Sequence, residues 1–568
     1  MELPKSGFLP AVFSALLAPF IRLVDKRSRP KYQGRLTLGG LEKTVQVKWD
    51  RFAIPHVTAA TEADLFLAQG YLHAQERLWQ MEMSRRFFSG RMAEIFGDFT
   101  LPSKDLTSYF RGRTCADLDY FLRILGIDAA AKATASHLAE PDRLRLQKYC
   151  DGINRYIEGC GRKLPWEFRV LRSQPGPWHP EDTLTIGKGL SLFLSPALFL
   201  RLNFMALAAH LKNEPQKLRD LYPATENVPT ITRAVWDQAS GLWQFTRGIL
   251  TSSGWAPSGQ GSNSWVVAPS RSKTGNAILC NDPHLRMTLP SLWYLIHLKG
   301  SDYEAWGASI PGLPFIQIGS NRRIAWGVTA AVCDDVEIYR EKLHRLEPSL
   351  YWAGEGWEKF KTRPEPIAIR GRRAVEQTIR LTRHGPVISD FHEAQATEEV
   401  LALRWTAHET SEELASVYQV NQARDWKEFK NALRRHGAPS LNFVYADAQG
   451  NIGYALAGKI PRRTQTPSLF PVEGWREENE WQGYLSFEEL PSLYNPPEGF
   501  IVTANNRIVD STYPYYLSHF FEPPYRFRRI HQLLSGREKF SAGDLATIQL
   551  DAVSLHAKEL MATLKDDL

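Results

Sequence analysis

Residues 259–285 read GQGSNSWVVAPSRSKTGNAILCNDPHL, and the interpretation of the whole chain depends on this stretch. Two short apolar runs, Trp265–Ala268 and Ala277–Cys280, flank turn-forming residues, which predicts a β-hairpin with a long loop. The hairpin begins where a glycine-rich loop delivers Ser262 to the edge of a strand. Two interpretations are open: Ser262 is a loop serine that starts a strand, or the chain cleaves itself after Gly261 and Ser262 becomes an N-terminal nucleophile.

The composition is ordinary for a soluble globular protein, with 43% hydrophobic and 23% charged residues. A formal net charge of +7 is small for 568 residues. No block of lysine and arginine carries interleaved aromatic residues, so nucleic acid is not an expected partner. The 17 Trp, 20 Tyr and 28 Phe suit a deep apolar pocket, although a large hydrophobic core accounts for them equally well.

The five cysteines are an odd number and have no C-x-x-C spacing. Both features argue against a disulfide framework and against a zinc site. The sequence leaves a single bridge open, for example between Cys150 and Cys160.

Residues 1–35 combine an apolar run with a basic cluster. The run Gly7–Phe20 is too short for a transmembrane helix. Only Lys5 precedes the run, its charge is offset by Glu2, and the basic cluster follows the run, which is the reverse of a signal peptide. A signal peptide, an interfacial helix and a buried helix all stay open, and the second would bring residues 7–35 to a membrane surface. The first two favour the periplasm or a membrane surface over the cytoplasm.

The pattern of apolar and polar residues divides the rest of the chain into three parts. Residues 36–215 are predicted to be mostly helical, and residues 262–568 are rich in β-like runs. Between them, residues 216–261 lose clear periodicity and contain scattered Pro, Gly and Trp, which predicts a connector or a removable spacer. Helices first and strands later, without βαβ alternation, predict an α+β fold.

Two secondary-structure elements have clear local sequence signals: a capped helix and a second β-hairpin. Thr61 and Asp64 are typical of the cap of a helix that runs from Glu62 towards Gly90. Two β-like runs, Phe443–Asp447 and Ile452–Ala457, flank Gln449-Gly450-Asn451 and predict a second hairpin. Further strands are expected at Leu292–Leu298, Phe315–Ile318, Ile324–Gly327, Val336–Arg340 and Ile501–Ala504.

Several catalytic motifs are absent from the sequence. It contains no G-x-S-x-G elbow, no H-E-x-x-H, no P-loop and no G-x-G-x-x-G. The α/β-hydrolase, zincin and nucleotide-binding classes are therefore not first choices.

What the sequence does contain is a series of short motifs in a fixed order from about residue 45 to the end. They are Asp50–Val57, Gly70–Glu82, Arg85-Arg86, Gly90–Glu94, Gly261–Trp265, Asn281–Leu285, Trp326–Ala330, Asp334–Glu337, Tyr445–Asp447, Gly450–Tyr454 and Thr503–Asn506. Together they resemble the penicillin acylase family of N-terminal nucleophile hydrolases, which includes cephalosporin and acyl-homoserine-lactone acylases. The resemblance implies a four-layer αββα core.

The resemblance also implies a mechanism. Ser262 attacks the Gly261 carbonyl, the resulting ester hydrolyses, and Ser262 becomes a free N-terminus. An α-amine has an ordinary pKa of roughly 7.7–8.0, so it can act as the base for its own hydroxyl. The family pattern assigns oxyanion binding to the backbone N–H of Ala330 and the side-chain amide of Asn505. Without the family, Asn505 reads as part of an Asn-Asn turn.

Two further residues carry an implied role beside a structural one. His284 matches a family histidine that tunes the amine or helps processing, and its alternative is a hydrogen-bonded loop histidine. Arg526 matches an arginine near the active-site mouth, and its alternative is a structural ion pair.

Some family members bind calcium, a hard ion that prefers oxygen ligands. The residues that match part of this site are Asp334, Val336, Glu337 and Pro467. Arg201 and Leu517 fall where two further carboxylates are expected, which argues against a complete site. The alternative is that Asp334 and Glu337 only tie down a loop, and no other cofactor is implied.

The family's second chain normally continues beyond the point that matches Asp551–Ser554, whereas this sequence ends at Leu568. The expectation is therefore a C-terminally truncated version of the fold, either a fragment or a shortened member.

The expected function is that of a self-processing amidohydrolase. It would cleave the acyl-amide bond of an N-acylated amine, such as a β-lactam side chain, through an acyl-enzyme on Ser262. The expected partners are this small-molecule substrate and the α and β chains of the same precursor. Two alternatives stay open: an acyl-homoserine-lactone acylase, and a catalytically inactive scaffold or binding protein.

Overall fold

The computed structural model describes residues 29–101, 112–211, 214–221, 233–253, 261–391, 398–464 and 467–567. The predicted apolar run Gly7–Phe20 lies outside the described residues, so the choice between a signal peptide and a helix stays a prediction.

Within the described residues the largest sheet has nine strands, in the order β1-β2-β5-β6-β7-β8-β16-β17-β19. Neighbouring strands are antiparallel except β2 and β5, which are parallel. The strands are β1 Gln46–Trp49, β2 Pro55–Thr58, β5 Tyr294–Lys299, β6 Glu304–Ile310, β7 Leu313–Asn321, β8 Ile324–Ala330, β16 Leu441–Asp447, β17 Ile452–Ala457 and β19 Ser492–Tyr494. Because β1 and β2 belong to the first part of the chain, both parts build one sheet.

A smaller sheet contains the hairpin that was predicted around Ser262. Its strands are β20 Phe500–Thr503, β3 Gly261–Val267 and β4 Ile278–His284, in that order. Strands β3 and β4 pair antiparallel with Gly261 opposite His284, so the predicted hairpin is confirmed. The predicted β16–β17 hairpin is confirmed as well.

Strand β3 lies between two apolar layers because its side chains alternate. Val266 packs in a cluster with Val444 and Tyr454 of the large sheet. On the opposite face, Trp265 and Val267 pack with residues of the C-terminal helices. The side chain of Ser262 shares the face of Val266 and therefore points between the two sheets.

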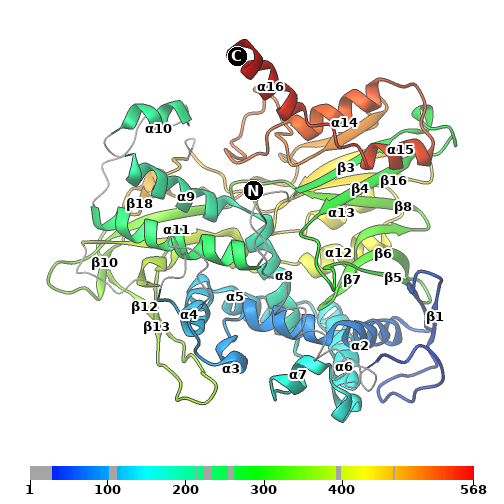
Figure 1. Ribbon diagram of the computed structural model, residues 1–568, viewed down its shortest axis with the longest axis horizontal. Coiled ribbons are helices and arrows are strands. Elements are labelled where there is room, and N and C mark those ends of the chain that lie inside the picture. The colour runs from blue at the N-terminus through cyan, green and yellow to red at the C-terminus, as the bar shows by residue number, and fades with distance from the viewer. Residues whose placement is uncertain are drawn as a thin grey trace, which may run out of the picture.

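Helices cover the outer face of each sheet, which completes a four-layer αββα arrangement as predicted. Figure 1 shows α14, α15 and α16 above β3 and β4, and α2 and α6 at the opposite end. The helices on the large sheet are α2 Glu62–Phe88, α8 Pro180–Leu194, α12 Glu413–Gln422 and α13 Trp426–Leu433, with α6 Glu140–Cys160 packed on α2. Those on the small sheet are α14 Tyr525–Ser535, α15 Ala542–Gln549 and α16 Leu555–Asp567.

A lobe beside these layers contains most of the remaining elements, whereas α7 lies near α6 (Figure 1). Its strands are β9 Val336–Lys342, β10 Leu350–Trp352, β11 Trp357–Lys359, β12 Lys361–Pro364, β13 Thr378–Thr382, β14 Gly385–Pro386, β15 Glu399–Trp405 and β18 Val472–Glu473. The helices not yet named are α3 Ala93–Phe96, α4 Cys115–Leu125, α5 Ile127–Ser136, α7 Trp166–Val170, α9 Ala197–His210, α10 Pro215–Leu221 and α11 Arg233–Ser253.

The segment 216–261 was expected to be a connector without clear periodicity, but the structure contains a long helix there. Most of its described part is the helix α11, and Val235, Ala239, Leu242 and Ile249 are buried in the main core. Their three-, four- and seven-residue spacing is helical, but two glycines and scattered tryptophans obscured it in the sequence. Whether the segment is a removable spacer stays a prediction.

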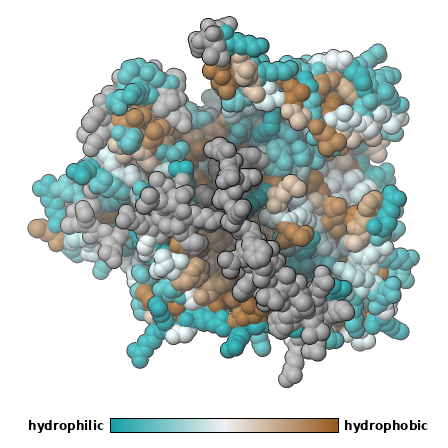
Figure 2. All heavy atoms as spheres, in the orientation of Figure 1, coloured by the Kyte–Doolittle hydropathy of each residue, from teal (hydrophilic) through white to brown (hydrophobic). Residues whose placement is uncertain are grey.

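Two further features are the hydropathy of the surface and the length of the apolar helices. Hydrophilic residues cover most of the rim of the face in Figure 2, with hydrophobic residues in small patches between them. In the described part of the chain, no single helix is long and apolar enough to cross a bilayer. Helices α8 and α9 meet that criterion only as a pair, and they are bent by 42° at their junction.

The single disulfide left open by the sequence does not form. Cys150 and Cys160 are both free, as are the other three cysteines. The two residues lie on the same helix, ten positions apart, so about 15 Å of helix separates them. A disulfide needs Cα atoms within about 7 Å of each other.

Helix α2 begins and packs in ways that depend on particular residues. Its predicted cap forms, because Thr61 Oγ1 accepts a hydrogen bond of 3.1 Å from the backbone N–H of Asp64. Along its contact with α6, Gly70 faces Tyr149 and Gly152 faces Leu67. A Cβ atom on Gly152 would lie 1.9 Å from the carbonyl oxygen of Leu67, so the two backbones touch directly.

We therefore expect Gly152→Ala to destabilise the protein, because α6 must move away from α2 to admit a methyl group. The free energy of unfolding should fall by ~1–3 kcal/mol or more. Gly159→Ala is the matched control on the same helix, since its Cβ would meet no atom within 4 Å. Chemical denaturation of both variants measures the difference, and equal effects would contradict the close packing.

Candidate active site

Ser262 is the second residue of β3, and it is 7% exposed between the two sheets. Its Oγ accepts a hydrogen bond of 3.0 Å from Asn505 Nδ2 and one of 3.4 Å from the backbone N–H of Ala330. Its own backbone N–H donates to Asn505 Oδ1 at 2.8 Å. Ser262, Ala330 and Asn505 come from three different strands or strand ends, and the fold brings them together.

Asn505 holds this arrangement from just beyond β20. Its backbone φ of 62° lies in the left-handed region, which asparagine tolerates better than most residues. Its amide is used at both ends, because Nδ2 also donates to Ala330 O at 2.8 Å. The neighbouring Asn506 accepts a hydrogen bond from the N–H of Ala504, so the Asn-Asn turn also exists. The left-handed backbone conformation of Asn505 persists only where surrounding contacts fix it.

Arg526 projects from α14 and braces the start of β3. Its guanidinium donates to the carbonyl oxygen of Ser262 at 2.9 Å, to Asn263 Oδ1 at 2.7 Å and to Asn505 Oδ1 at 2.9 Å. Burial lowers the pKa of this guanidinium. Arg526 therefore places a positive charge and three donors next to the nucleophile candidate.

His284 lies opposite Gly261 in the register of β3 and β4. Its Nδ1 is 3.0 Å from the carbonyl oxygen of Asp282 and 3.2 Å from that residue's carboxylate. Since both neighbours are acceptors, Nδ1 carries the proton, and a neutral ring keeps Nε2 as an acceptor. The hydrogen bond from His284 lowers the pKa of Asp282.

Two side chains approach Gly261 closely. A Cβ atom there would lie 2.8 Å from Arg526 Nη2 and 2.9 Å from His284 Nε2. The imidazole and the guanidinium therefore reach the residue whose carbonyl group precedes Ser262. The sequence motif gave no indication of this close approach.

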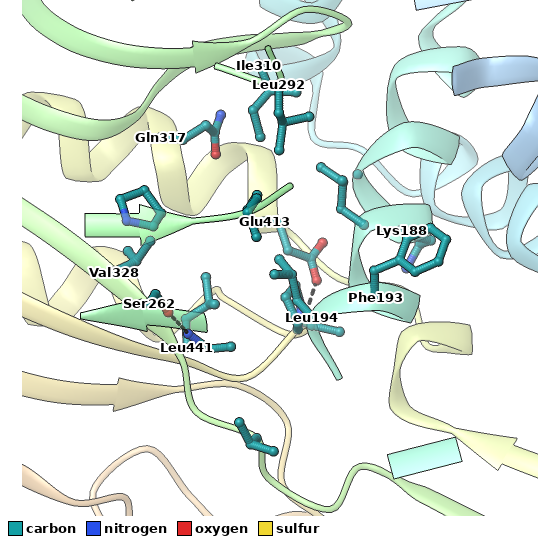
Figure 3. Close-up of a pocket in the computed structure, with 18 of the residues that line it drawn as sticks. Lys188, Phe193, Leu194, Ser262, Leu292, Ile310, Gln317, Val328, Glu413 and Leu441 are labelled. Carbon is teal, nitrogen blue, oxygen red and sulfur yellow. Dashed lines mark hydrogen bonds between the residues drawn. The ribbon is translucent and has the colours of Figure 1, made fainter. Parts of the chain in front are cut away.

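A cavity of about 280 Å³ opens beside Ser262 and Asn505. Figure 3 shows Ser262 and Val328 on one side of it and Phe193 on the other. Its walls come from strands, loops and the helices α8, α9, α11 and α12. Its apolar lining includes Leu190, Phe193, Phe199, Trp243, Leu285, Leu292, Val328, Leu441 and Phe443. The polar lining residues besides Ser262 and Asn505 include Lys188, Gln317, Glu413, His436 and Glu522. The sequence predicted an apolar pocket in general but none of these residues.

The residues that matched a calcium site are all engaged by protein donors. Arg201 contacts the carboxylates of Asp334 at 2.7 Å and Glu337 at 3.1 Å. Arg463 contacts Glu337 at 3.1 Å and donates to the carbonyl oxygen of Val336 at 3.2 Å. The carbonyl oxygen of Pro467 lies 3.3 Å from a ring nitrogen of a histidine, His519.

This set does not fit a calcium ion. Two guanidinium groups already balance the two carboxylates, and a divalent cation would be placed next to both of them. Burial opposes ionisation of Asp334, but Arg201 and Arg463 outweigh it and lower the pKa of that carboxyl. In the parts of the chain that the structure describes, no cluster of three or more His, Cys, Asp or Glu residues could hold a metal. Arg201 was noted from the sequence, whereas Arg463 was not.

Comparisons with known proteins agree with this geometry. The penicillin amidase family model matches residues 44–568. Penicillin acylase 2 proenzyme of Pseudomonas sp. (strain SE83) is 32% identical, over 94% of this chain and 68% of that protein. Acyl-homoserine lactone acylase QuiP of Pseudomonas aeruginosa is 29% identical, over 99% of this chain and 67% of that protein.

Among solved structures, a thermostable penicillin G acylase from Alcaligenes faecalis is 30% identical, with a TM-score of 0.45 over 50% of this chain and 51% of that one. The family match covers almost the whole chain. The chain spans about two thirds of the length of the two curated relatives. This protein therefore belongs to the penicillin amidase family, and its αββα layers are those of an N-terminal nucleophile hydrolase.

Proposed function

We propose that this protein is a self-processing hydrolase of acyl-amide bonds, with Ser262 as its nucleophile. The observation that carries the proposal is the position of Ser262 Oγ. It receives hydrogen bonds from two N–H donors and lines an apolar cavity, directly after a glycine that the Arg526 and His284 side chains approach closely.

Processing begins with the attack of Ser262 Oγ on the carbonyl carbon of Gly261. The peptide C–N bond breaks as an ester bond forms, and water then hydrolyses the ester. The products are a carboxylate on Gly261 and a free amine on Ser262. The hydroxyl proton ends on the departing nitrogen of Ser262. His284 Nε2 reaches Gly261 from the face of β3 opposite the Ser262 side chain, so it could help processing only by positioning Gly261.

Hydrolysis of a substrate uses the new amine. It takes the proton of Ser262 Oγ through a water molecule, and Oγ attacks the acyl carbonyl carbon. The N–H of Ala330 and the Asn505 side chain are placed to receive the developing oxyanion. The leaving amine accepts a proton, and water then releases the acid from the ester. The charge of Arg526 disfavours protonation of the Ser262 amine and so keeps more of it unprotonated near neutral pH.

The two chains made by processing would stay together as the α and β partners. Strand β2 lies before the cleavage point and pairs with β5 after it, and α2 and α8 pack on the sheet that both parts build.

The apolar lining favours a substrate with an aliphatic or aromatic acyl group. The two curated relatives are named as a penicillin acylase and an acyl-homoserine lactone acylase. The mainly aliphatic walls support a fatty-acyl lactone as the second candidate substrate, beside β-lactam side chains. An inactive scaffold would have no need for two donors at Ser262 Oγ.

We also infer that no metal ion is required. Arg201 and Arg463 supply, within the chain, the positive charge that balances Asp334 and Glu337.

Replacement of the nucleophile tests the proposal directly. We expect Ser262→Ala to remain a single chain that does not hydrolyse p-nitroanilides of phenylacetic, hexanoic or decanoic acid. Ser262→Cys keeps a nucleophile and should still be cut after Gly261. N-terminal sequencing and intact mass identify the products, and absorbance measures turnover.

Two results would contradict the proposal. Cleavage of Ser262→Ala after Gly261 would show that processing is not autocatalytic. Absence of turnover by the processed wild-type protein on every p-nitroanilide would favour the scaffold alternative.

The arginine pair gives a separate prediction about stability. EDTA and added calcium should leave the melting temperature unchanged. Arg201→Met should lower the free energy of unfolding by about 3–5 kcal/mol, because it leaves one guanidinium, that of Arg463, to balance two buried carboxylates. Arg345→Met is the control, since its ion pair with Glu398 is highly exposed and should contribute little. A lower melting temperature in EDTA would contradict metal independence.

A further inference from the structure

Three charged residues line the cavity, and the proposed chemistry uses none of them. Glu522 lies at the Asn505 end, where its backbone N–H donates to the carbonyl oxygen of Asn505. The other two, Lys188 and Glu413, carry opposite charges.

Lys188 projects from α8, and Glu413 is the first residue of α12. In Figure 3, Glu413 lies between Ser262 and Val328 on one side and Lys188 and Phe193 on the other. A group that binds between these walls therefore passes the carboxylate.

Lys188 has no donor left for a ligand. Its ammonium group donates to the carbonyl oxygens of Ala407 and Glu409, each at 2.9 Å, and to Ser411 Oγ at 3.3 Å. An ammonium has three protons, so these contacts use all of them. The side chain is 6% exposed. Lys188 therefore acts as a fixed charge beside the cavity.

Glu413 differs, because it keeps acceptor capacity. Its Oε1 accepts a hydrogen bond of 2.9 Å from the N–H of Ala438, and its Oε2 accepts one of 2.8 Å from Ser411 Oγ. A carboxylate offers about four acceptor positions, so about two remain. Burial opposes ionisation of Glu413, but Lys188 is the main group that outweighs it and lowers the pKa.

The surroundings of Glu413 make its remaining acceptors selective. The neighbouring lining residues Leu194, Leu414, Val417 and Leu441 are apolar. An acyl group without a donor would displace water from the carboxylate and offer no hydrogen bond in return, which is costly.

The charges select the kind of donor. An anionic acyl group would be repelled by Glu413 itself. A cationic group beside Glu413 would be repelled by the fixed ammonium of Lys188, which is close enough to lower the pKa of Glu413. A neutral hydroxyl donates one hydrogen bond and adds no charge.

We propose that Glu413 is a specificity-determining residue that accepts a hydrogen bond from a hydroxyl group on the substrate's acyl chain. The proposal rests on the proposed function of Ser262, since it places the acyl group in this cavity. The substrate class is thus a hydroxylated aryl or alkyl acyl amide.

Matched pairs of p-nitroanilides test this proposal: 4-hydroxyphenylacetyl against phenylacetyl, and 8-hydroxyoctanoyl against octanoyl. The wild-type protein should prefer the hydroxylated member of at least one pair by about tenfold in kcat/KM, as expected for a hydrogen bond to a charged group. Glu413→Gln should bring that ratio close to one. Glu412→Gln makes the same change on the adjacent exposed residue and should leave the ratio unchanged.

A second variant covers the risk that Glu413→Gln leaves Lys188 uncompensated and unfolds. The double variant Lys188→Met with Glu413→Leu removes both charges and should reverse the preference towards the unhydroxylated acyl group. If wild type shows no preference, or if both members of a pair fall equally in the variants, Glu413 has only a structural role and the proposal is overturned.

Binding of the free acids to the wild-type protein separates this proposal from the proposed function. Calorimetry with 4-hydroxyphenylacetate and phenylacetate needs no turnover. Preferential binding of the hydroxylated acid without hydrolysis of any amide would support the role of Glu413 and contradict that of Ser262. Hydrolysis without any preference, in turnover or binding, would do the reverse.

Discussion

The register of strand β3 is the constraint on which the site depends. The strand is paired along both edges, with β4 on one side and β20 on the other. Because side chains alternate along a strand, a shift of one residue would turn Ser262 towards α14 and place Trp265 between the sheets. Trp265 and Val267 pack in the cluster on one face of the strand, and Val266 packs in the cluster on the other. Because these apolar side chains fix the register, they also fix the position of Ser262 on the same strand.

Around this fixed strand, the polar groups form a connected arrangement. Asn505 contacts both the N–H and the hydroxyl of Ser262, and Arg526 contacts Asn505 and the Ser262 carbonyl. Each group thus orients another, as an active site needs if its donors are to be in place before the reaction begins. The same design recurs at the arginine pair, where Arg201 and Arg463 fix the loop between β8 and β9 that begins just after Ala330.

The sequence predicted those features that have a local signal. Alternation and turn residues identified both hairpins, and Thr61 identified the start of α2. Collinear motifs pointed to Ser262, Ala330 and Asn505, although only the fold shows that they meet. Features that depend on distant contacts were not predictable. Glu413 and Lys188 are 225 residues apart and become neighbours only when α8 packs near α12. Helix α11 was obscured because packing against α9, and not its own composition, stabilises it.

Covalent labelling with a sulfonyl fluoride, followed by mass spectrometry of the separated chains, tests the central claim most directly. The account predicts one adduct, on the first residue of a chain that begins at Ser262. Labelling of a different residue, or a Ser262 found unlabelled within an uncut chain, would contradict it.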